Sequence, residues 1–254
     1  MKKPLCLLLA LSMALALFTL AALAESDASD SPSPCESSQP YDPDYAPPDC
    51  GNVTLEDLEV PLSGAQYFLD VLKGRWYEDA VKFVYENGLM SGVSDIFFAP
   101  DAPTTRAMLI VILHRLEGEP TPKNFAEPPF SDISSDAWCG DAIFWAADQN
   151  IANGDGSGLF YPDEQLTREQ LAAIFMRYSQ YKGNPCTERA ILEVFADSGK
   201  VSPWAYDAMS WAFYAGLITG VSETELASEC FASRAQLAVI LMRYLGDDFM
   251  LSQE

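Results

Sequence analysis

Basic residues are scarce in this sequence. Its 254 residues include 15 Lys and Arg against 37 Asp and Glu, which gives a formal net charge of −22 at pH 7. Because nucleic-acid binding draws on clustered Lys and Arg, this balance argues against nucleic acid, and also against an anionic membrane surface. High net charge mainly keeps a protein soluble, and it still permits an anionic ligand held by a few local arginines.

Residues that commonly perform catalysis or bind metal are also few. The chain has a single histidine, His114, and its carboxylates are scattered without a distinct acid–base pair. The cysteines form no C-x-x-C pair, and the sequence contains no nucleophile motif or phosphate-binding glycine loop. We therefore expect a chain that is not an enzyme and that carries neither a metal nor a cofactor.

One long apolar run occurs, at the N-terminus. Lys2 and Lys3 precede a run from Pro4 to Ala24, which ends in small residues and is followed by the acidic Glu25. This order is typical of a secretory signal peptide over residues 1–24. A retained transmembrane anchor is the alternative, because the run is nearly long enough to span a bilayer. We expect cleavage and export.

The segment after the apolar run is acidic and rich in Ser and Pro. Over residues 25–65 it cannot bury enough apolar surface to order itself, and we expect a mostly disordered tether. Export also permits disulfides, although all cysteines staying reduced is the alternative. The candidate pairs are Cys35–Cys50 and Cys186–Cys230, which would leave Cys139 as a free core residue.

A threefold internal repeat fills the rest of the chain. Each copy contains a Phe-x-Asp start, a tryptophan, a glycine 16 residues after the tryptophan, and an arginine 30 residues after it. Such self-similarity indicates one structural unit per copy. The copies cover residues 66–121, 128–182 and 193–247, and their landmarks are Asp70, Trp76, Gly92 and Arg106; Asp132, Trp138, Gly154 and Arg168; and Asp197, Trp204, Gly220 and Arg234.

Each copy reads as helix, loop, helix. Apolar residues at helical spacing predict a first helix that starts at the tryptophan, with Ser202 as the N-cap in copy three, and a second helix that starts at Thr105, Thr167 or Ser233. Gln170 and Gln236 complete capping boxes in copies two and three. Left-handed residues are expected to end the first helices at Gly88, Asn150 and Gly216. One amphipathic pair cannot bury its face alone, so we predict an all-α fold in which three pairs share a core.

The repeat resembles the S-layer homology family over residues 66 to 247. The similarity rests on the Phe-x-Asp start, the tryptophan, a Gly-Leu-x-x-Gly segment and a Thr-Arg-Ala-Glu-like motif that opens the second helix. Copy two fits best, with Phe160, Pro162 and the motif at 167–170. Copy three departs furthest, because residues 226–228 replace the aromatic-x-Pro sequence, and no copy keeps the glutamate of the motif.

The resemblance implies a fold and a function. Members of that family form a pseudo-threefold, three-pronged spindle whose grooves bind secondary cell-wall polymers, often with pyruvate ketals on an amino sugar. The expected partner is therefore an acidic secondary cell-wall polysaccharide or peptidoglycan-linked polymer, and the expected location is the cell wall or cell surface. A surface scaffold that binds other proteins is the first alternative, and an enzyme acting on wall glycans is the second.

The three arginines are the sharpest candidates for ligand contact. Arg106, Arg168 and Arg234 each occupy the first position of a helix, where the helix macrodipole disfavours a cation. A cation at this unfavourable helix position in all three copies indicates a functional role. Free helix N–H groups beside an arginine fork would also suit a carboxylate.

The other landmarks have structural readings beside the functional one. Each tryptophan either packs in the core or offers a ligand platform. Each glycine supplies a positive φ or a close backbone approach, with sugar contact as a secondary role. The aspartates are expected to cap loops or turns rather than to touch ligand. The candidates of this kind are Trp76, Trp138, Trp204, Gly92, Gly154, Gly220, Asp70, Asp132 and Asp197.

Overall fold

Six α-helices make up the regular structure of the described part of the chain. The computed structural model describes residues 67–122, 128–134 and 136–251. The first helices of the copies are α2 (Glu78–Glu86), α4 (Gly140–Asp148) and α6 (Tyr206–Tyr214). The second helices are α3 (Arg106–Leu116), α5 (Arg168–Tyr181) and α7 (Arg234–Leu251), and short 3-10 turns η1 (Leu192–Val194) and η2 (Ser198–Lys200) precede α6. The expected signal peptide, the tether and the Cys35–Cys50 pair lie outside the described residues.

The predicted second helices are confirmed, because their start signals are local. Thr105 accepts a hydrogen bond from the Met108 amide, and Thr167 forms a full capping box with Gln170. Ser233 and Gln236 exchange the same two bonds, at 3.2 Å each. These caps satisfy amides that the helix itself leaves without a partner.

The first helices begin later than the apolar spacing predicted. Each tryptophan lies in a turn, and the helix starts two residues after it. Ser202 is therefore not an N-cap, since Ala205 holds that position in α6 without a side-chain cap bond. The first-helix ends are as expected, because Gly88, Asn150 and Gly216 have φ values of 66°, 57° and 69°.

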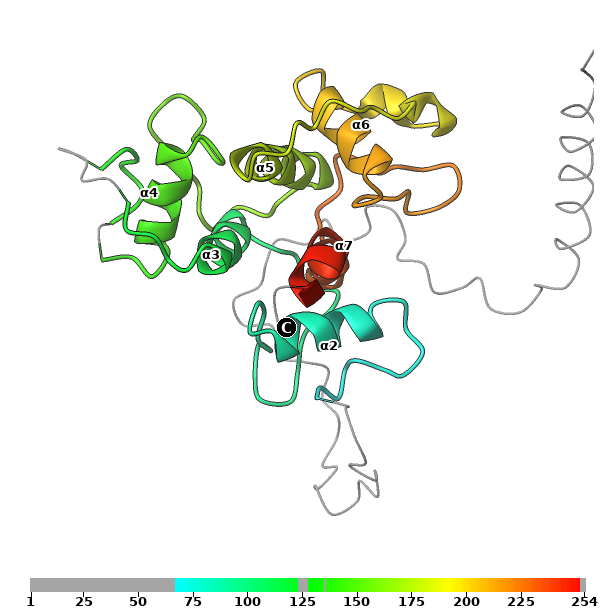
Figure 1. Ribbon diagram of the computed structural model, residues 1–254, viewed down its shortest axis with the longest axis horizontal. Helices are drawn as coiled ribbons and strands as arrows, with labels where there is room; N and C mark the ends of the chain where they lie inside the picture. The colour runs from blue at the N-terminus through cyan, green and yellow to red at the C-terminus, as the bar shows by residue number, and fades with distance from the viewer. Residues whose placement is uncertain (1–66, 123–127, 135, 252–254) are drawn as a thin grey trace, which may run out of the picture. The chain divides into compact units, whose positions relative to one another are not determined.

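Helices pack between copies rather than within them. Helix α3 of copy one packs on α4 of copy two, and α5 of copy two packs on α6 of copy three. The order then closes, since α7 of copy three packs on α2 of copy one (Figure 1). Each packed pair thus takes its second helix from one copy and its first helix from the next.

A ring of three backbone hydrogen bonds lies where the copies meet. The amide of Thr104 donates to the carbonyl of Ala232, that of Ala232 to Leu166, and that of Leu166 back to Thr104, at 2.8–2.9 Å. All three residues are buried. The contacts therefore follow a cyclic order, whereas the three-pronged spindle shape stays a prediction.

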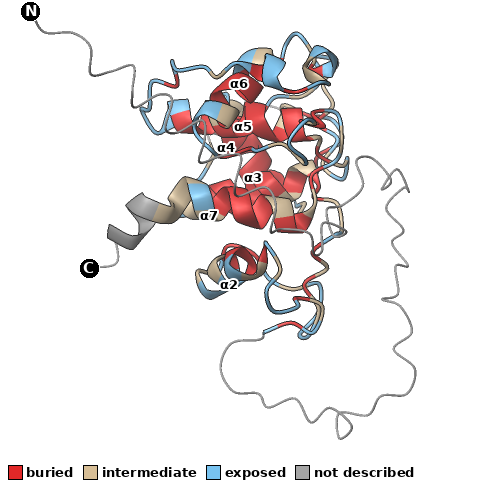
Figure 2. Cartoon of the chain, turned by 90° about the vertical axis from the view of Figure 1, so that its right-hand side faces the viewer, coloured by how far each residue is buried: buried red, intermediate tan, exposed pale blue. Residues whose placement is uncertain are grey.

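The hydrophobic core is built mainly from helix residues. Buried residues gather on α3, α5, α4 and the N-terminal part of α7, as Figure 2 shows in red. Cys139 and Cys186 are both buried free thiols. The Cys186–Cys230 pair is therefore not formed, and Cys139 is a free core residue as predicted.

Candidate functional site

Each landmark arginine crosses from its own copy to the loop of the next copy. We name these contact regions the Arg106, Arg168 and Arg234 junctions. In every junction the arginine Nε donates to the carbonyl at the end of the loop, and Nη2 donates to a carbonyl near its start. The acceptors are Phe160 (3.0 Å) and Asn153 (3.1 Å) for Arg106, Leu226 (3.1 Å) and Thr219 (2.6 Å) for Arg168, and Phe98 (2.9 Å) and Ser91 (2.6 Å) for Arg234.

The helix N-termini at the junctions are not free, contrary to the expectation above. The first two amides of each second helix donate to carbonyls of the next copy. For α3 these bonds run from Arg106 to Glu164 and from Ala107 to Pro162, at 3.0 and 2.9 Å. The amides of α5 and α7 bond in the same way. A ligand carboxylate therefore cannot use these amides, and any anion binding must rely on the arginine side chain.

Burial sets the electrostatics of the junctions. Arg168 and Arg234 are 5% and 7% exposed, and Arg106 is half-buried. Burial lowers the pKa of all three arginines, and it lowers that of Arg168 to about 10. All three remain cations at neutral pH, because even a pKa of about 10 lies well above 7. Carbonyl dipoles hold them, and no described carboxylate forms an ion pair with any of the three.

Aromatic rings support two of the three arginines. The guanidinium of Arg106 lies 4.7 Å from the ring centroid of Phe160, and that of Arg234 lies 4.6 Å from Phe98. Leu226 takes the corresponding place in the Arg168 junction. The cation–π attraction is therefore missing from that junction.

The aspartate landmarks brace the loops, as their structural reading predicted. Asp197 accepts the amides of Leu226 and Ala227, both at 2.8 Å. Asp70 and Asp132 bind the equivalent amides in their copies. In each case the second amide belongs to a residue with a positive φ, so the carboxylate stabilises an unfavourable backbone conformation.

The glycine landmarks permit close backbone approach. A Cβ added to Gly154 would lie 2.3 Å from the carbonyl oxygen of Leu159 and 2.8 Å from the ring of Phe130. The same contacts recur at Gly92 and Gly220, and none of the three has a positive φ. Of the two roles predicted, close approach is thus the one that these glycines fill.

The tryptophan landmarks lie outside the core. Trp76, Trp138 and Trp204 are 51%, 68% and 57% exposed. Large apolar side chains repeated at one exposed position are typical of an interaction surface. The turn of Trp204 comes close to the arginine helix of copy two, because Ser202, two residues before Trp204, contacts Glu169, the residue after Arg168.

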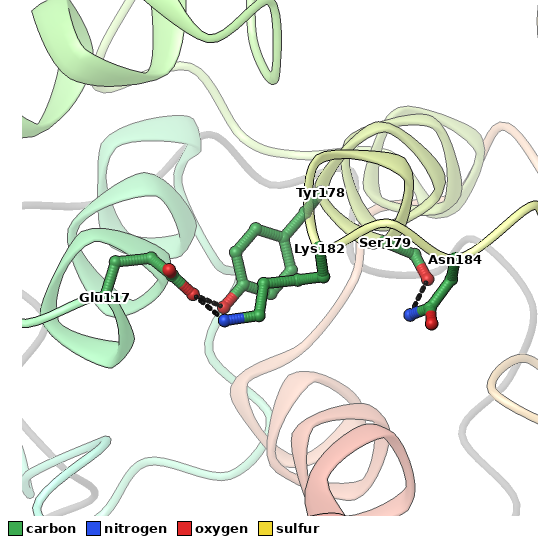
Figure 3. Close-up of polar contacts among 5 residues, drawn as sticks. All are labelled: Glu117, Tyr178, Ser179, Lys182 and Asn184. Carbon is green, nitrogen blue, oxygen red and sulfur yellow. Dashed lines mark hydrogen bonds and ion pairs between the residues drawn. The ribbon is translucent and has the colours of Figure 1, made fainter.

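Two polar contacts between copies were not predicted. Glu169 accepts from both the amide and the hydroxyl of Ser202, a residue 33 positions later. Glu117 accepts from Tyr178 at 2.6 Å and from Lys182 at 2.8 Å (Figure 3). Burial and the bond to Glu117 both raise the pKa of Tyr178, so this hydroxyl stays protonated and cross-links copies one and two.

The described residues contain neither a cluster of metal ligands nor a helix that could span a membrane. Within residues 67–122, 128–134 and 136–251, no three His, Cys, Asp or Glu side chains gather as metal ligands would. The helices of those same segments are all too short or too polar to cross a bilayer.

Comparison with known proteins identifies the repeat. A family model described as the S-layer homology domain matches residues 67–107, 129–172 and 194–238, one match per copy. The relatives include an endoglucanase of Bacillus sp. (strain KSM-635), 31% identical over 72% of this chain and 19% of the relative. They also include the surface-layer 125 kDa protein of Lysinibacillus sphaericus, 29% identical over 72% of this chain and 15% of the relative.

The relatives are much longer than the part that aligns. A cell surface protein of Thermoanaerobacter kivui is 28% identical over 74% of this chain, which corresponds to 22% of that relative. This chain thus spans less than a quarter of each of these three relatives. The family match and the surface-layer relatives indicate a location at the cell wall or cell surface. With a match to the family model in every copy, the chain belongs to the S-layer homology domain family.

Proposed function

We propose that this chain attaches non-covalently to the bacterial cell wall by binding an acidic, pyruvylated secondary polysaccharide at the junctions between its copies. The observation that carries the proposal is the state of the three arginines. Each is a cation held by backbone carbonyls, with no ion-pair partner among the described carboxylates. A ligand carboxylate would neutralise such a charge and form charge-assisted bonds with it.

The arginine geometry leaves one donor edge for a ligand. Nε and Nη2 of each guanidinium bond to the neighbouring copy, whereas Nη1 donates to no residue of the described chain. The surrounding chain is strongly acidic. An anionic polymer would therefore be repelled over most of the surface, and its binding would have to be local.

The exposed tryptophans supply the second half of the site. An indole offers a large apolar face and an N–H donor, and both suit a sugar ring with its C–H and hydroxyl groups. Trp138, Trp204 and Trp76 belong to the copies that the Arg106, Arg168 and Arg234 junctions reach. We expect each ligand unit to place its carboxylate at the arginine and its sugar ring on the tryptophan.

The test is co-sedimentation of residues 25–254 with cell walls. The wild type is expected to bind native walls and not walls stripped of secondary polymer by acid. Replacing Trp76, Trp138 and Trp204 together by Ala should abolish sedimentation without changing the thermal melt, because these side chains are exposed. The matched control is Tyr214→Ala, which removes an aromatic ring that is 58% exposed and is none of the landmarks.

The outcomes separate the alternatives. A tryptophan variant that sediments like wild type would reject the tryptophan platform. Wild-type binding to stripped walls would point to peptidoglycan itself, and binding to neither preparation would favour a surface scaffold for proteins. Arginine variants are less suitable here, because their loss also removes bonds that hold the copies together. Release of reducing sugar from walls would support the enzyme alternative instead.

A further inference from the structure

The three junctions differ at the residue that follows the arginine. Copies one and three have Ala107 and Ala235 there, and both are fully buried. Copy two has Glu169, which is also buried, at 6% exposure. An aspartate (Asp132, Asp197 or Asp70) approaches the arginine in every junction. Among the three junctions, only the Arg168 junction has in addition a buried carboxylate at the position that follows the arginine.

Glu169 joins the two sides of that junction. Its Oε1 accepts from the Ser202 hydroxyl at 2.8 Å, and its Oε2 accepts from the Ser202 amide at 3.0 Å. Ser202 lies in copy three, two residues before Trp204. The Glu169 side chain thus lies between the arginine helix of copy two and the tryptophan turn of copy three, where the proposed ligand would bind.

The loop on the far side of the Arg168 junction has changed as well. Leu226 replaces the phenylalanine that stacks on the arginine in the other two junctions. Ser228 replaces the loop proline, and its buried hydroxyl has no hydrogen-bond partner among the described residues. Arg168 keeps its two hydrogen bonds to the loop but lacks the aromatic contact that orients the guanidinium in the other two junctions.

A ligand carboxylate entering the Arg168 junction would meet a buried negative charge. Like charges that share a buried site repel strongly, since little water screens them. Its sugar ring would also have to displace the Glu169–Ser202 contact. In the Arg106 and Arg234 junctions an alanine methyl group occupies the same position. It neither repels the ligand carboxylate nor blocks the sugar ring.

We infer that Glu169 closes the Arg168 junction to acidic ligands, so that the chain binds two ligand units, at the Arg106 and Arg234 junctions, instead of three. This inference rests on the proposed function and specifies which junctions perform it. Glu169 acts as a specificity-determining residue, and its replacement opens the third site.

Native mass spectrometry of residues 25–254 tests this by counting bound ligands. The probe is a methyl glycoside of an N-acetylated amino sugar that carries a pyruvate ketal. Wild type is expected to saturate at two ligands. Glu169→Ala should reach three, and Glu169→Gln shows whether the charge alone is responsible. Glu223→Ala is the control, because it removes the same charge from an exposed position in the copy-three loop and should stay at two.

Single tryptophan variants locate the occupied junctions. Trp138→Ala and Trp76→Ala should each lower the count to one, whereas Trp204→Ala should leave it at two. A wild type that binds three ligands, or a Glu169→Ala variant that still binds two, would overturn the inference while the proposed function stands. A wild type that binds no ligand would overturn both.

Discussion

Two sets of landmarks recur with the same spacing yet lie in opposite environments. The arginines, aspartates and glycines lie at the junctions, where they bond or pack against the backbone of a loop. The tryptophans lie in exposed turns and are not part of the core. Regular recurrence in the sequence therefore indicates a shared constraint, and it does not distinguish a constraint of folding from one of binding.

The difference assigns separate tasks to the two sets. The junction residues close three copies into a cyclic arrangement, in which the main α-helix pairs, α3 with α4, α5 with α6 and α7 with α2, are shared between neighbouring copies. The tryptophan side chains form none of the hydrogen bonds described at the junctions, and more than half of each is exposed. The junctions should hence dominate stability and the tryptophans should dominate binding, with the arginines contributing to both.

The largest loss of stability is expected for Arg234→Ala. This change removes the bonds from Arg234 to the carbonyls of Phe98 and Ser91, which close copy three onto copy one. Losing two bonds from a charged donor, and leaving the carbonyl of the buried Phe98 without a partner, should lower the free energy of unfolding by about 2–5 kcal/mol. Urea unfolding followed by circular dichroism measures the change.

The control for Arg234→Ala is Arg115→Ala. Arg115 is exposed, and among the described residues its ion pair is a 3.9 Å contact with Glu119, a type of contact that contributes little. Equal unfolding midpoints for the two variants would contradict a structural role for the junction arginines.

Gly154→Ala is expected to have the next largest effect. The new Cβ would press on the Leu159 carbonyl, which is backbone and cannot rotate away. Such overpacking costs about 1–3 kcal/mol, to be measured as a lower melting temperature. Gly199→Ala is the matched control, since an added Cβ there meets nothing within 4 Å. If Gly154→Ala melts at the wild-type temperature, the loop is less tightly held than the contacts indicate.

Asp197 gives a smaller effect with a defined pH dependence. Burial raises the pKa of this carboxyl, but the amides of Leu226 and Ala227 outweigh it, so the pKa lies below its ordinary value. Its stabilisation is therefore complete above the unfolded pKa of about 4 and is lost as the pH falls through the folded pKa.

The test for this carboxyl is Asp197→Asn. The variant should cost about 1–2 kcal/mol at pH 7, because one amide then faces an NH₂ group. Urea unfolding between pH 2 and pH 7 should show the wild type approaching the variant below pH ~4. A gap between them that stays constant over this range would rule out the carboxylate as the stabilising form.

The sequence was most informative where the signal is local. The caps Thr105, Thr167 and Ser233 start their helices as predicted, because their partners lie three residues away. The start of the first helices was mispredicted, since a tryptophan at helical spacing looks like a core residue whether or not it is buried. Periodicity reports position on a helix face and does not report exposure.

The junction contacts could not be predicted, because their partners are distant in sequence. Arg234 bonds to carbonyls more than 130 residues earlier. Every residue has a backbone carbonyl, so a bond to a carbonyl requires no particular residue type and leaves no motif in the sequence. Glu169 could have been noticed as a charged residue where the other copies have alanine. Its closing contact with Ser202 emerges only when copies two and three are packed together.

The smallest effect on stability is expected at the exposed tryptophans. Trp138 is 68% exposed, so Trp138→Ala should change the free energy of unfolding by less than about 0.5 kcal/mol. The same variant should weaken binding to native walls, in contrast to Arg234→Ala, which weakens folding first. Urea unfolding and wall co-sedimentation are measured on both proteins. Arg234→Ala should show the large loss of stability, whereas Trp138→Ala should lose wall binding at nearly unchanged stability. If Trp138→Ala proves as destabilising as Arg234→Ala, the tryptophans belong with the folding landmarks after all, and the division between the two sets fails.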